Sequence, residues 1–414
     1  MPINEKTKKV LTLAVQAGEI ILRSGGETVR VEETVNLLVK SFGIQHSHCM
    51  VTPTGLYLSI DDEQMNYPLT VIRRVHYRSV NYNSIFDVND LSRRVVRGLV
   101  TLEEAQHELD QIEHTPKLYP FWLWLGAGAG TAAGTTLLLG GGPLDVIPAL
   151  LSTILIQLLV VLFKKAHIPA IFGDFCGAAL ATAIALGLAW LGLPIHTNLV
   201  VAGAIIRLVP GAALVTSVQD GISGDLISSA ARGLETFLRG AALASGVGLA
   251  LSAALQLGVN TGPFDQAGGE AWQIPIQVVA AFLASSCYAI SNQIPRFAIL
   301  TAGLAGATGW LTHLLIMRLN NTSLLVTFLA AFVVGILSWG LARWQHSPIT
   351  LYILPGILPL LPGLTIYKGM LYLAQNQPTE GMILLAQATF LGGSLAAGVA
   401  LSNSLVPLLW HRKS

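Results

Sequence analysis

The feature that most constrains this chain is a series of long apolar stretches that begins near residue 121 and continues almost to the C-terminus. A membrane-spanning helix needs about 20 consecutive, mostly apolar residues. Such stretches lie near residues 121–139, 146–163, 171–193, 198–218, 233–257, 274–293, 297–317, 322–342, 349–372 and 381–409. The sequence therefore predicts a polytopic α-helical membrane protein with ten transmembrane helices in a lipid bilayer.

Charged residues divide the chain into two parts. Residues 1–118 hold 13 Lys and Arg and 15 Asp and Glu, whereas the remaining 296 residues hold 19 charged side chains. Only 11% of the whole chain is charged, against roughly 25% in soluble proteins. We therefore expect a small water-soluble domain at residues 1–118, followed by the membrane part. The net charge of +1 gives no indication of a nucleic-acid partner.

The pattern within residues 1–118 is that of a small α+β domain. A helical stripe of apolar residues covers residues 5–23. The capping-box spacing of Ser24 and Glu27 predicts that a second helix starts there and stops at Gly43. The elements expected next are a strand ending at Val51, a strand from Leu56 to Ile60, a strand from Leu69 to Tyr77, a helix from Asn89 to Arg97, and a helix capped by Thr101 and Glu104.

The loop charges orient the predicted helices, because cytoplasmic loops of membrane proteins carry an excess of Lys and Arg. With the N-terminal domain inside, the inner loops carry Lys164, Lys165, Arg296, Arg343, Arg412 and Lys413. The outer loops then carry Asp145, Asp265, Glu270 and Glu380, with Arg318 as their cation. We therefore expect both termini in the cytoplasm.

Two halves of the membrane part correspond at a constant offset of 152 residues. The matched pairs are Pro210 with Pro362, Gly211 with Gly363, Gly240 with Gly392 and Gly246 with Gly398. The halves, residues 119–260 and 270–414, hold five predicted helices each. Because five is an odd number, the second repeat is inverted relative to the first, and the predicted membrane fold is a 5+5 inverted repeat.

We interpret Pro210-Gly211 and Pro362-Gly363 as breaks in two helices that frame a substrate site. Proline removes a backbone donor, and the following glycine lets the chain turn. Inside a bilayer, the freed backbone groups are tolerated only where protein or a water-filled cavity satisfies them. Two breaks in corresponding positions indicate a transporter's binding site, where half-helix N-termini can receive an anion. Simple proline kinks are the alternative.

Four charged residues near the breaks are candidates for substrate or proton binding. Asp220 and Asp225 follow the first break in a glycine-rich segment, and carboxylates at a membrane cavity can carry protons. An ordinary solvated loop is the alternative. Arg207 lies deep in its predicted helix, where it either neutralises an Asp or binds a substrate carboxylate. Lys368 follows the second break and poses the same question.

Arg232, Glu235 and Arg239 share one face of a predicted helix. We expect them to form a structural ion-pair ladder at the cytoplasmic entrance, and we keep Glu235 as a third proton-coupling candidate. Asp174, at the start of the third predicted span, is expected to cap its helix.

No motif indicates an enzyme. Intramembrane aspartyl proteases carry one catalytic Asp in a GxGD motif, but here Ile222 takes the place of the first Gly before Gly224-Asp225. No GxSxG serine is present either. The three cysteines are far apart in sequence, and His46 and His48 have no further metal ligands nearby. We therefore expect neither catalysis nor a metal or cofactor.

The chain resembles the threonine/serine exporter family in its two-part fused form. The matching stretches are Ser24 to Glu32, Thr52 to Gly55, Val88 to Arg93, Val209 to Glu235, Ile294 to Arg296, Gly306 to Trp310 and Leu361 to Gly363. The run from Pro210 to Glu235 is the most specific of these.

This resemblance implies an inner-membrane exporter of the small hydroxy amino acids threonine and serine, driven by the proton gradient and without a cofactor. Split-chain relatives are tied to dicarboxylate export, so export of succinate-like dicarboxylates is the first alternative. A membrane receptor or regulator, in which the N-terminal domain signals and nothing is transported, is the alternative from another class. The sequence leaves a homo-oligomer open.

Overall fold

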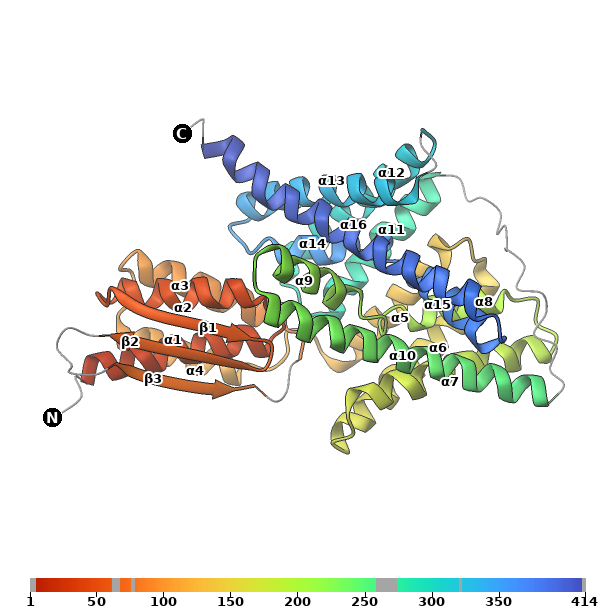
Figure 1. Ribbon diagram of the computed structural model, residues 1–414, viewed down its shortest axis with the longest axis horizontal. Helices are drawn as coiled ribbons and strands as arrows, with labels where there is room; N and C mark the ends of the chain where they lie inside the picture. Colours follow the sequence, from red (N-terminus) through yellow and green to blue (C-terminus); the bar gives the residue numbers. More distant parts are fainter. Residues whose placement is uncertain (1–4, 62–67, 76–78, 258–273, 320–321, 412–414) are drawn as a thin grey trace.

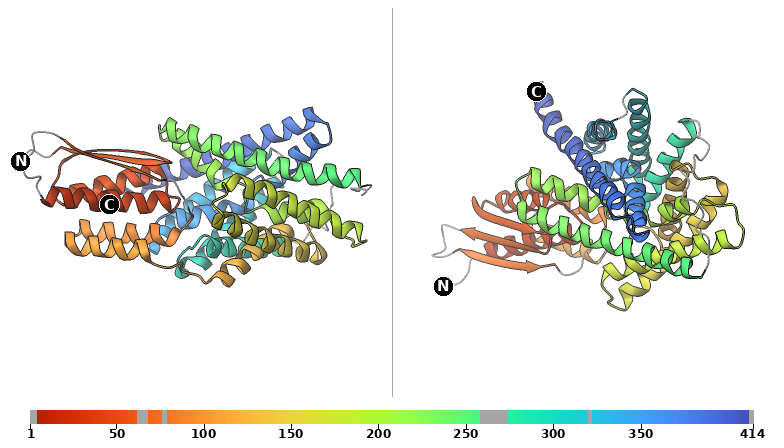
Figure 2. Two further views of the ribbon diagram at one scale, coloured as in Figure 1. Left: turned by 90° about the horizontal axis from the view of Figure 1, so that it is seen from below. Right: turned by 45° about the vertical axis from the view of Figure 1, so that its right-hand side comes forward.

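The computed structural model describes residues 5–61, 68–75, 79–257, 274–319 and 322–411. The N-terminal unit contains α1 (Glu5–Arg23), α2 (Thr28–Ser41), β1 (His46–Thr52), β2 (Gly55–Asp61), β3 (Leu69–Arg74), α3 (Tyr82–Val96) and α4 (Leu102–His114). The helical part contains α5 (Phe121–Leu138), α6 (Pro143–Lys165), α7 (Ala170–Trp190), α8 (Thr197–Ile205), α9 (Gly211–Ile222), α10 (Leu226–Gln256), α11 (Ile274–Ser291), η1 (Arg296–Ala298), α12 (Ile299–Met317), α13 (Ser323–Trp344), α14 (Thr350–Ile357), η2 (Leu358–Leu360), α15 (Gly363–Ala374) and α16 (Pro378–His411). The N-terminal unit lies at one end of the helical part (Figure 1, Figure 2).

The three strands of the N-terminal unit form one antiparallel sheet in the order β1-β2-β3. The two-residue turn Pro53-Thr54 joins β1 and β2 in a hairpin. Leu56, Leu58 and Ile60 of β2 are fully buried, because their side of the sheet is covered by α1 and α2 (Figure 2). The alternation predicted for this strand is therefore confirmed.

The start of α2 differs from the sequence prediction. The helix begins at Thr28, and its N-cap residue Glu27 makes no side-chain capping hydrogen bond. The predicted capping box of Ser24 and Glu27 is therefore wrong. The chain between α1 and α2 turns instead through Gly25, whose φ of 92° is a left-handed conformation that favours glycine.

The helices α3 and α4 complete the N-terminal unit. α3 begins earlier than predicted, at Tyr82, because Asn81 caps it by accepting a hydrogen bond from Ser84 N (3.4 Å). α4 has the predicted capping box. Glu104 N donates to Thr101 Oγ1 (3.3 Å), and Thr101 N donates to Glu104 Oε2 (2.8 Å).

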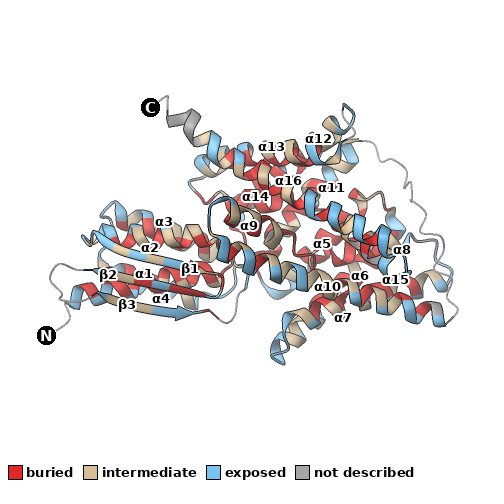
Figure 3. Ribbon diagram, viewed as in Figure 1, coloured by how far each residue is buried: buried red, intermediate tan, exposed pale blue. Residues whose placement is uncertain are grey.

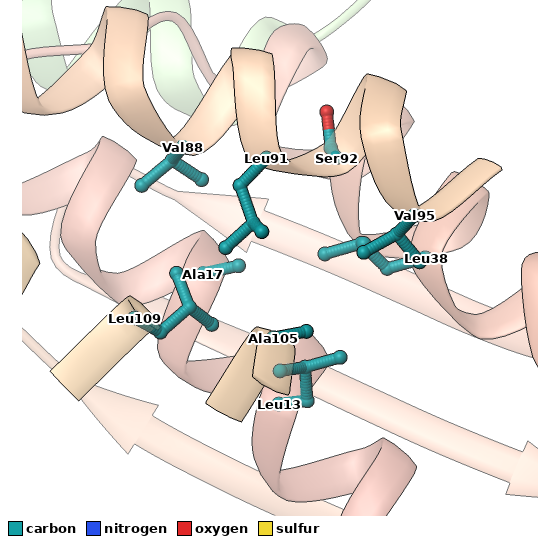
Figure 4. Close-up of a pocket in the computed structure, with 9 residues that line it drawn as sticks. All are labelled: Leu13, Ala17, Leu38, Val88, Leu91, Ser92, Val95, Ala105 and Leu109. Atoms are coloured by element: carbon teal, nitrogen blue, oxygen red, sulfur yellow. The ribbon is translucent and has the colours of Figure 1, made fainter. Parts of the chain in front are cut away.

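The core of the N-terminal unit lies between α1, α2, α3 and α4. The gap that Figure 4 shows there is lined by Leu13, Ala17, Leu38, Val88, Leu91, Ser92, Val95, Ala105 and Leu109. It has no room for a water molecule. The hydroxyl of Ser92 donates a hydrogen bond to the carbonyl oxygen of Asn89 (2.8 Å). This gap is therefore packed core and not a ligand site.

Each stretch that was predicted to span the membrane is helical. Seven of the described helices are long and apolar enough to cross a bilayer, namely α6, α7, α10, α11, α12 with η1, α13 and α16. Two predicted spans are instead pairs of short helices, α8 with α9 and α14 with α15, each interrupted near the predicted proline. The total of ten membrane passes stays a prediction.

Successive helices of this part run between two ends. The loops after α9, α11 and α13 lie beside the N-terminal unit. The contacts are Thr28 Oγ1 to Asp225 Oδ2 (3.0 Å), Tyr82 N to Asn292 O (3.2 Å) and Arg93 Nη1 to His346 O (3.1 Å). The connections from α5 to α6 and from α7 to α8 meet at the other end, where His196 N donates to Asp145 Oδ1 (2.6 Å). Consequently α5 starts beside the N-terminal unit and α11 starts at the far end (Figure 1).

The helical part repeats its element pattern along the chain. Adding 152 to the bounds of α9 gives those of α15. The same backbone hydrogen bonds also surround both breaks. They are Gly211 N to Val209 O (2.8 Å) and Leu214 N to Pro210 O (3.0 Å), matched by Gly363 N to Leu361 O (2.8 Å) and Ile366 N to Pro362 O (3.0 Å).

Gly246 and Gly398 are a matched pair that lets helices approach closely. A Cβ atom on Gly246 would collide with the carbonyl oxygen of Phe175 in α7, and one on Gly398 would collide with that of Phe328 in α13. Small residues at helix interfaces allow such contact inside membranes. The pairs α7–α10 and α13–α16 thus pack alike, with their buried residues toward the interior of the helical part (Figure 3).

Candidate functional site

The two helix breaks lie against each other in the interior. Pro210-Gly211 and Pro362-Gly363 are all buried. A Cβ atom on Gly211 would lie 2.6 Å from Leu361 Cδ1, and one on Gly363 would lie 2.9 Å from Ile206 Cδ1. Each break therefore touches the turn that precedes the other. Because α9 and α15 both begin here, two half-helix N-termini with their positive dipole ends meet at this point.

Arg207 lies in the first break and is held by neutral groups. Its Nη1 donates a short hydrogen bond to Gln157 Oε1 in α6, and its guanidinium lies over the Trp124 ring of α5, 5.5 Å from the centroid. Gln157 is itself fixed by donating to Leu125 O (3.1 Å). Within the described part of the chain, no carboxylate forms an ion pair with Arg207. The described residues thus do not bear out the interpretation that Arg207 neutralises an Asp, and none of them gives its charge a carboxylate partner.

Room for Arg207 is made by a glycine of α5. A Cβ atom on Gly128 would collide with both Arg207 Nη1 and Gln157 Oε1. The contact between α5, α6 and the first break thus depends on a residue without a side chain.

Lys368 stands apart from this cluster. It lies in α15 and is partly buried. The described side chains give it no ion pair or hydrogen bond. Lys368 and Arg207 thus both belong to the broken helices, one in each.

Asp220 forms a buried ion pair with Arg232. Arg232 Nε lies 3.0 Å from Asp220 Oδ2, and the two side chains are 8% and 3% exposed. Asp220 comes from the last turns of α9 and Arg232 from the second turn of α10, so the pair closes the tight turn between these helices. The alternative of a solvated loop is therefore wrong for Asp220, which is buried in the protein.

The start of α2 in the N-terminal unit completes the carboxylate cluster. The Thr28 hydroxyl lies 3.3 Å from Asp220 Oδ1 and 3.0 Å from Asp225 Oδ2. Arg232 Nη2 donates to the carbonyl oxygen of Gly26 (3.1 Å). Asp225 also caps α10 by accepting a hydrogen bond from Ser228 N (3.1 Å). Groups from residues far apart in sequence thus form one polar site at the end of α9.

The two carboxylates differ in their affinity for a proton. Burial raises the pKa of Asp220 to about 6, against the opposing effect of Arg232. Burial also acts to raise the pKa of Asp225, but hydrogen bonds from Ser228 and Thr28 hold that pKa below its ordinary value. Neighbouring acids whose pKa values are pushed apart take different roles. Asp220 is therefore the carboxylate that can gain and lose a proton near neutral pH.

Arg239 and Asp174 form a second ion pair, between α10 and α7. Arg239 Nε donates to Asp174 Oδ2 (2.6 Å) and Nη2 donates to Oδ1 (3.0 Å). Pro169 is the N-cap of α7, so the expected capping role of Asp174 is wrong. The ion pairs of Arg232 and Arg239 cross to other helices, in addition to the predicted interaction along α10 between Glu235 and Arg239. Glu235 lies between them in sequence and adds its negative charge beside the Arg239 pair.

Two tyrosines, buried Tyr82 and partly buried Tyr288, lie near the charged groups of these sites. Tyr288 of α11 is close enough to Arg207 to interact electrostatically with it. Tyr82 of the N-terminal unit interacts in the same way with Tyr288 and with Arg232.

The sequence analysis missed several residues of these sites. Thr28 and Gly26 were read only as part of a helix start, although they lie in one of the matching stretches. Gln157 and Trp124 gave a weaker signal, since Gln157 is a lone amide in an apolar helix. A polar residue inside a predicted span is a reason to expect such a contact.

One surface groove lies away from these clusters. It has a volume of about 420 Å³ and is lined by Ile336, Trp339, Gly340, Arg343, Trp344 and Val406. None of the predicted site residues lines it.

Comparison with known families matches nearly the whole chain. Residues 12–254 match the family model described as "Putative threonine/serine exporter". Residues 277–405 match the model described as "Threonine/Serine exporter, ThrE". No solved structure matches the chain significantly.

Individual relatives agree with these matches. The chain is 27% identical over 406 residues to a protein named "Probable threonine/serine exporter" from Mycobacterium tuberculosis, covering 96% of this chain and 77% of the relative. It is 29% identical over 402 residues to the "Threonine/serine exporter" of Corynebacterium glutamicum, covering 95% and 82%. It is also 28% identical over 253 residues to "Probable succinate transporter subunit YjjP" of Escherichia coli, covering 60% of this chain and 96% of that subunit.

Proposed function

The chain belongs to the threonine/serine exporter family, and we propose that it is a proton-coupled secondary transporter that exports threonine and serine across the inner membrane. As a multi-pass membrane protein it acts on a small molecule, and the proton gradient supplies the energy. The proposal places both termini and the N-terminal unit in the cytoplasm. The positive-inside loop charges support that orientation.

The observation that carries this proposal is the contact between the two helix breaks. Broken helices that meet at the midplane are the usual binding site of secondary transporters. The substrate carboxylate would bind at the N-termini of α9 and α15, where the dipoles favour an anion. The ammonium group would bind carbonyl groups freed by Pro210 and Pro362. An amino acid thus finds groups for both of its charges at one place.

An inverted repeat would allow this site to face either side of the membrane in turn. We propose that α5–α10 and α11–α16 form that repeat. The common offset of 152 and the opposite starting ends of α5 and α11 support it. Rocking of one repeat against the other would then expose the site alternately.

Proton coupling is assigned to the carboxylate cluster, with Asp220 as the group that titrates. When Asp220 is ionised, Arg232 is neutralised by it. When Asp220 takes up a proton, the ion pair is lost, and Arg232 keeps its hydrogen bond to the carbonyl of Gly26 and the more distant charge of Asp225. Loss of one partner of a buried pair is costly, so protonation would favour a different arrangement of α9 and α10. The negative charges of Asp225 and Glu235 would influence the electrostatic potential at Asp220 and Arg232 during this step.

Export of dicarboxylates is the second candidate function. Arg207 favours it, because this partly buried cation has neutral partners, Gln157 and Trp124, among the described residues and can accommodate an anion. A dicarboxylate needs two cations, and Lys368 of the second broken helix would supply the other. The similarity to the YjjP subunit over part of the chain fits this candidate as well.

Counterflow in proteoliposomes separates these functions. The full chain is reconstituted into vesicles, and the vesicles are preloaded with unlabelled substrate. Uptake of labelled threonine, serine and succinate is then measured. We expect exchange of threonine and serine that responds to a pH gradient. If Arg207→Gln removes a succinate flux that the exposed control Arg318→Gln leaves intact, the dicarboxylate function holds instead. Absence of flux for all three substrates would contradict both candidates.

A further inference from the structure

The N-terminal unit contributes directly to the carboxylate cluster, and we propose that Thr28 is a positioning residue for the proton that Asp220 carries. This inference rests on the proposed proton coupling and extends it to the N-terminal unit. In this view the unit is a working part of the transporter, because its α2 completes the site at which the proton is bound.

The geometry places a single hydroxyl between two acids. Thr28 is 0% exposed, and its Oγ1 lies 3.3 Å from Asp220 Oδ1 and 3.0 Å from Asp225 Oδ2. A hydroxyl has one hydrogen to donate and can also accept. The two acids therefore share one donor, which stabilises one ionised carboxylate at a time and competes with the proton for that oxygen.

The second contribution of the N-terminal unit fixes the counter-ion. Gly26 O accepts a hydrogen bond from Arg232 Nη2 (3.1 Å), while Arg232 Nε lies 3.0 Å from Asp220 Oδ2. The loop that carries Gly26 is pressed against α1, since a Cβ atom there would collide with the side chain of Ile21. The carbonyl is thus held in place, and with it the guanidinium that faces Asp220.

The other groups that face the two acids are few. Asp220 faces Arg232 of α10, Glu27 and Thr28 of the N-terminal unit, and Asp225. Asp225 faces Ser228, Thr28 and Arg232. Among these, the Thr28 hydroxyl is the one neutral donor that reaches both carboxylates. Its removal takes a donor away from the ionised forms, so both acids should bind protons more readily.

The test is the pH dependence of threonine counterflow in the full chain. Thr28→Val removes the hydroxyl at nearly constant volume. We expect the midpoint of the pH profile to move upward by about 0.5 to 1 unit, which corresponds to the loss of one ordinary hydrogen bond. Thr28→Ser keeps the hydroxyl and should restore the wild-type midpoint.

Thr34 provides a matched control on the same helix. It is 6% exposed, and its hydroxyl donates to the carbonyl oxygen of Arg30 (2.9 Å) and to no carboxylate. Thr34→Val should therefore leave the midpoint unchanged even if it lowers the melting temperature. If the Thr28 contact only docks the N-terminal unit, Thr28→Val should likewise leave the midpoint unchanged.

The outcomes separate this inference from the proposed function. Wild-type flux with an unchanged midpoint in Thr28→Val overturns the inference alone, whereas absence of wild-type flux overturns the function. If Thr28→Val does not fold, Thr28→Ala is used, and the pH dependence of the melting temperature in detergent replaces flux. An upward shift of that dependence supports the inference, and parallel curves for wild type and variant contradict it.

Discussion

Arg232 Nε lies 3.0 Å from Asp220 Oδ2, and both side chains are almost completely buried. The pair joins the end of the first broken helix to α10, and Arg232 also reaches the N-terminal unit through Gly26 O. Protonation of this buried carboxylate would remove its charge and with it the ion pair to Arg232. The relationship therefore connects the helix break, the N-terminal unit and the proposed proton step.

The Asp220–Arg232 pair should be strongly coupled in its effect on stability. Asp220→Ala or Arg232→Ala leaves the other charge buried and unpaired, which typically costs about 3–5 kcal/mol. The double variant removes both charges and should lose clearly less than the sum of the single losses. Unfolding of the four proteins in detergent forms the double-mutant cycle. Additive losses would show that the pair contributes no coupling.

Asp220→Asn should abolish proton-coupled flux while the protein still folds, whereas Asp225→Asn, which removes a neighbouring charge, should only lower that flux. An amide keeps the shape of the carboxyl group but cannot bind and release a proton. Counterflow across a pH gradient measures the effect, and Asp61→Asn at the exposed end of β2 serves as the matched control. Wild-type rates of counterflow in both variants would show that these two carboxylates take no part in proton coupling.

The raised pKa of Asp220 predicts a pH-dependent stability difference between wild type and Asp220→Asn. Burial raises this pKa to about 6 in the folded protein, against about 3.9 in an unfolded chain. The folded state therefore binds the proton more tightly, and the stabilisation from protonation is lost as the pH rises from about 4 to about 6. Melting temperatures of wild type should fall relative to Asp220→Asn across this window. Parallel curves would contradict the raised pKa.

The contact between the two breaks should tolerate no added side chain. Gly211→Ala and Gly363→Ala place a Cβ atom 2.6 Å from Leu361 and 2.9 Å from Ile206. We expect a loss of about 1–3 kcal/mol from overpacking and a large loss of counterflow. Gly187→Ala in α7 is the control, because a Cβ atom there meets nothing within 4 Å. Equal behaviour of all three variants would mean that the breaks do not touch.

The proposed orientation can be tested by cysteine labelling in a background without native cysteines. Lys165→Cys changes the last residue of α6, at the end of the helical part that faces the N-terminal unit, and Gln375→Cys follows α15 at the far end; both positions are exposed. An impermeant maleimide added to intact cells should label Gln375→Cys but not Lys165→Cys. Labelling of both cysteines from the same side of the membrane would contradict the inverted repeat.

Much of the secondary structure could be predicted from the sequence. The apolar stretches located the helices, and the alternation of Leu56, Leu58 and Ile60 located β2, because burial imposes these patterns directly. The capping box at Ser24 failed, since the same spacing also occurs where a glycine turns the chain. Asp174 likewise has the spacing of a cap but pairs with Arg239, a contact that depends on how α7 packs against α10.

The candidate site was predictable only in part. The repeated Pro-Gly pairs identified both breaks, and the positions of Asp220 and Asp225 in an otherwise uncharged segment marked them as candidates. The partners of these residues were not readable. Thr28 and Gly26 lie almost 200 residues before Asp220, and no local pattern relates residues at that separation.

The sequence by itself determined that this chain is a multi-pass membrane protein of the threonine/serine exporter family, with two matched helix breaks and a charged N-terminal part. The family follows from the resemblance of the matching stretches, and the other features follow from composition, periodicity and spacing, which act locally. The tertiary structure decided that the breaks touch, that Arg207 rests on Gln157 and Trp124, and that α2 docks on Asp220 and Arg232. Such contacts depend on which buried polar groups can satisfy one another once distant segments pack together, and only the folded chain resolves that choice.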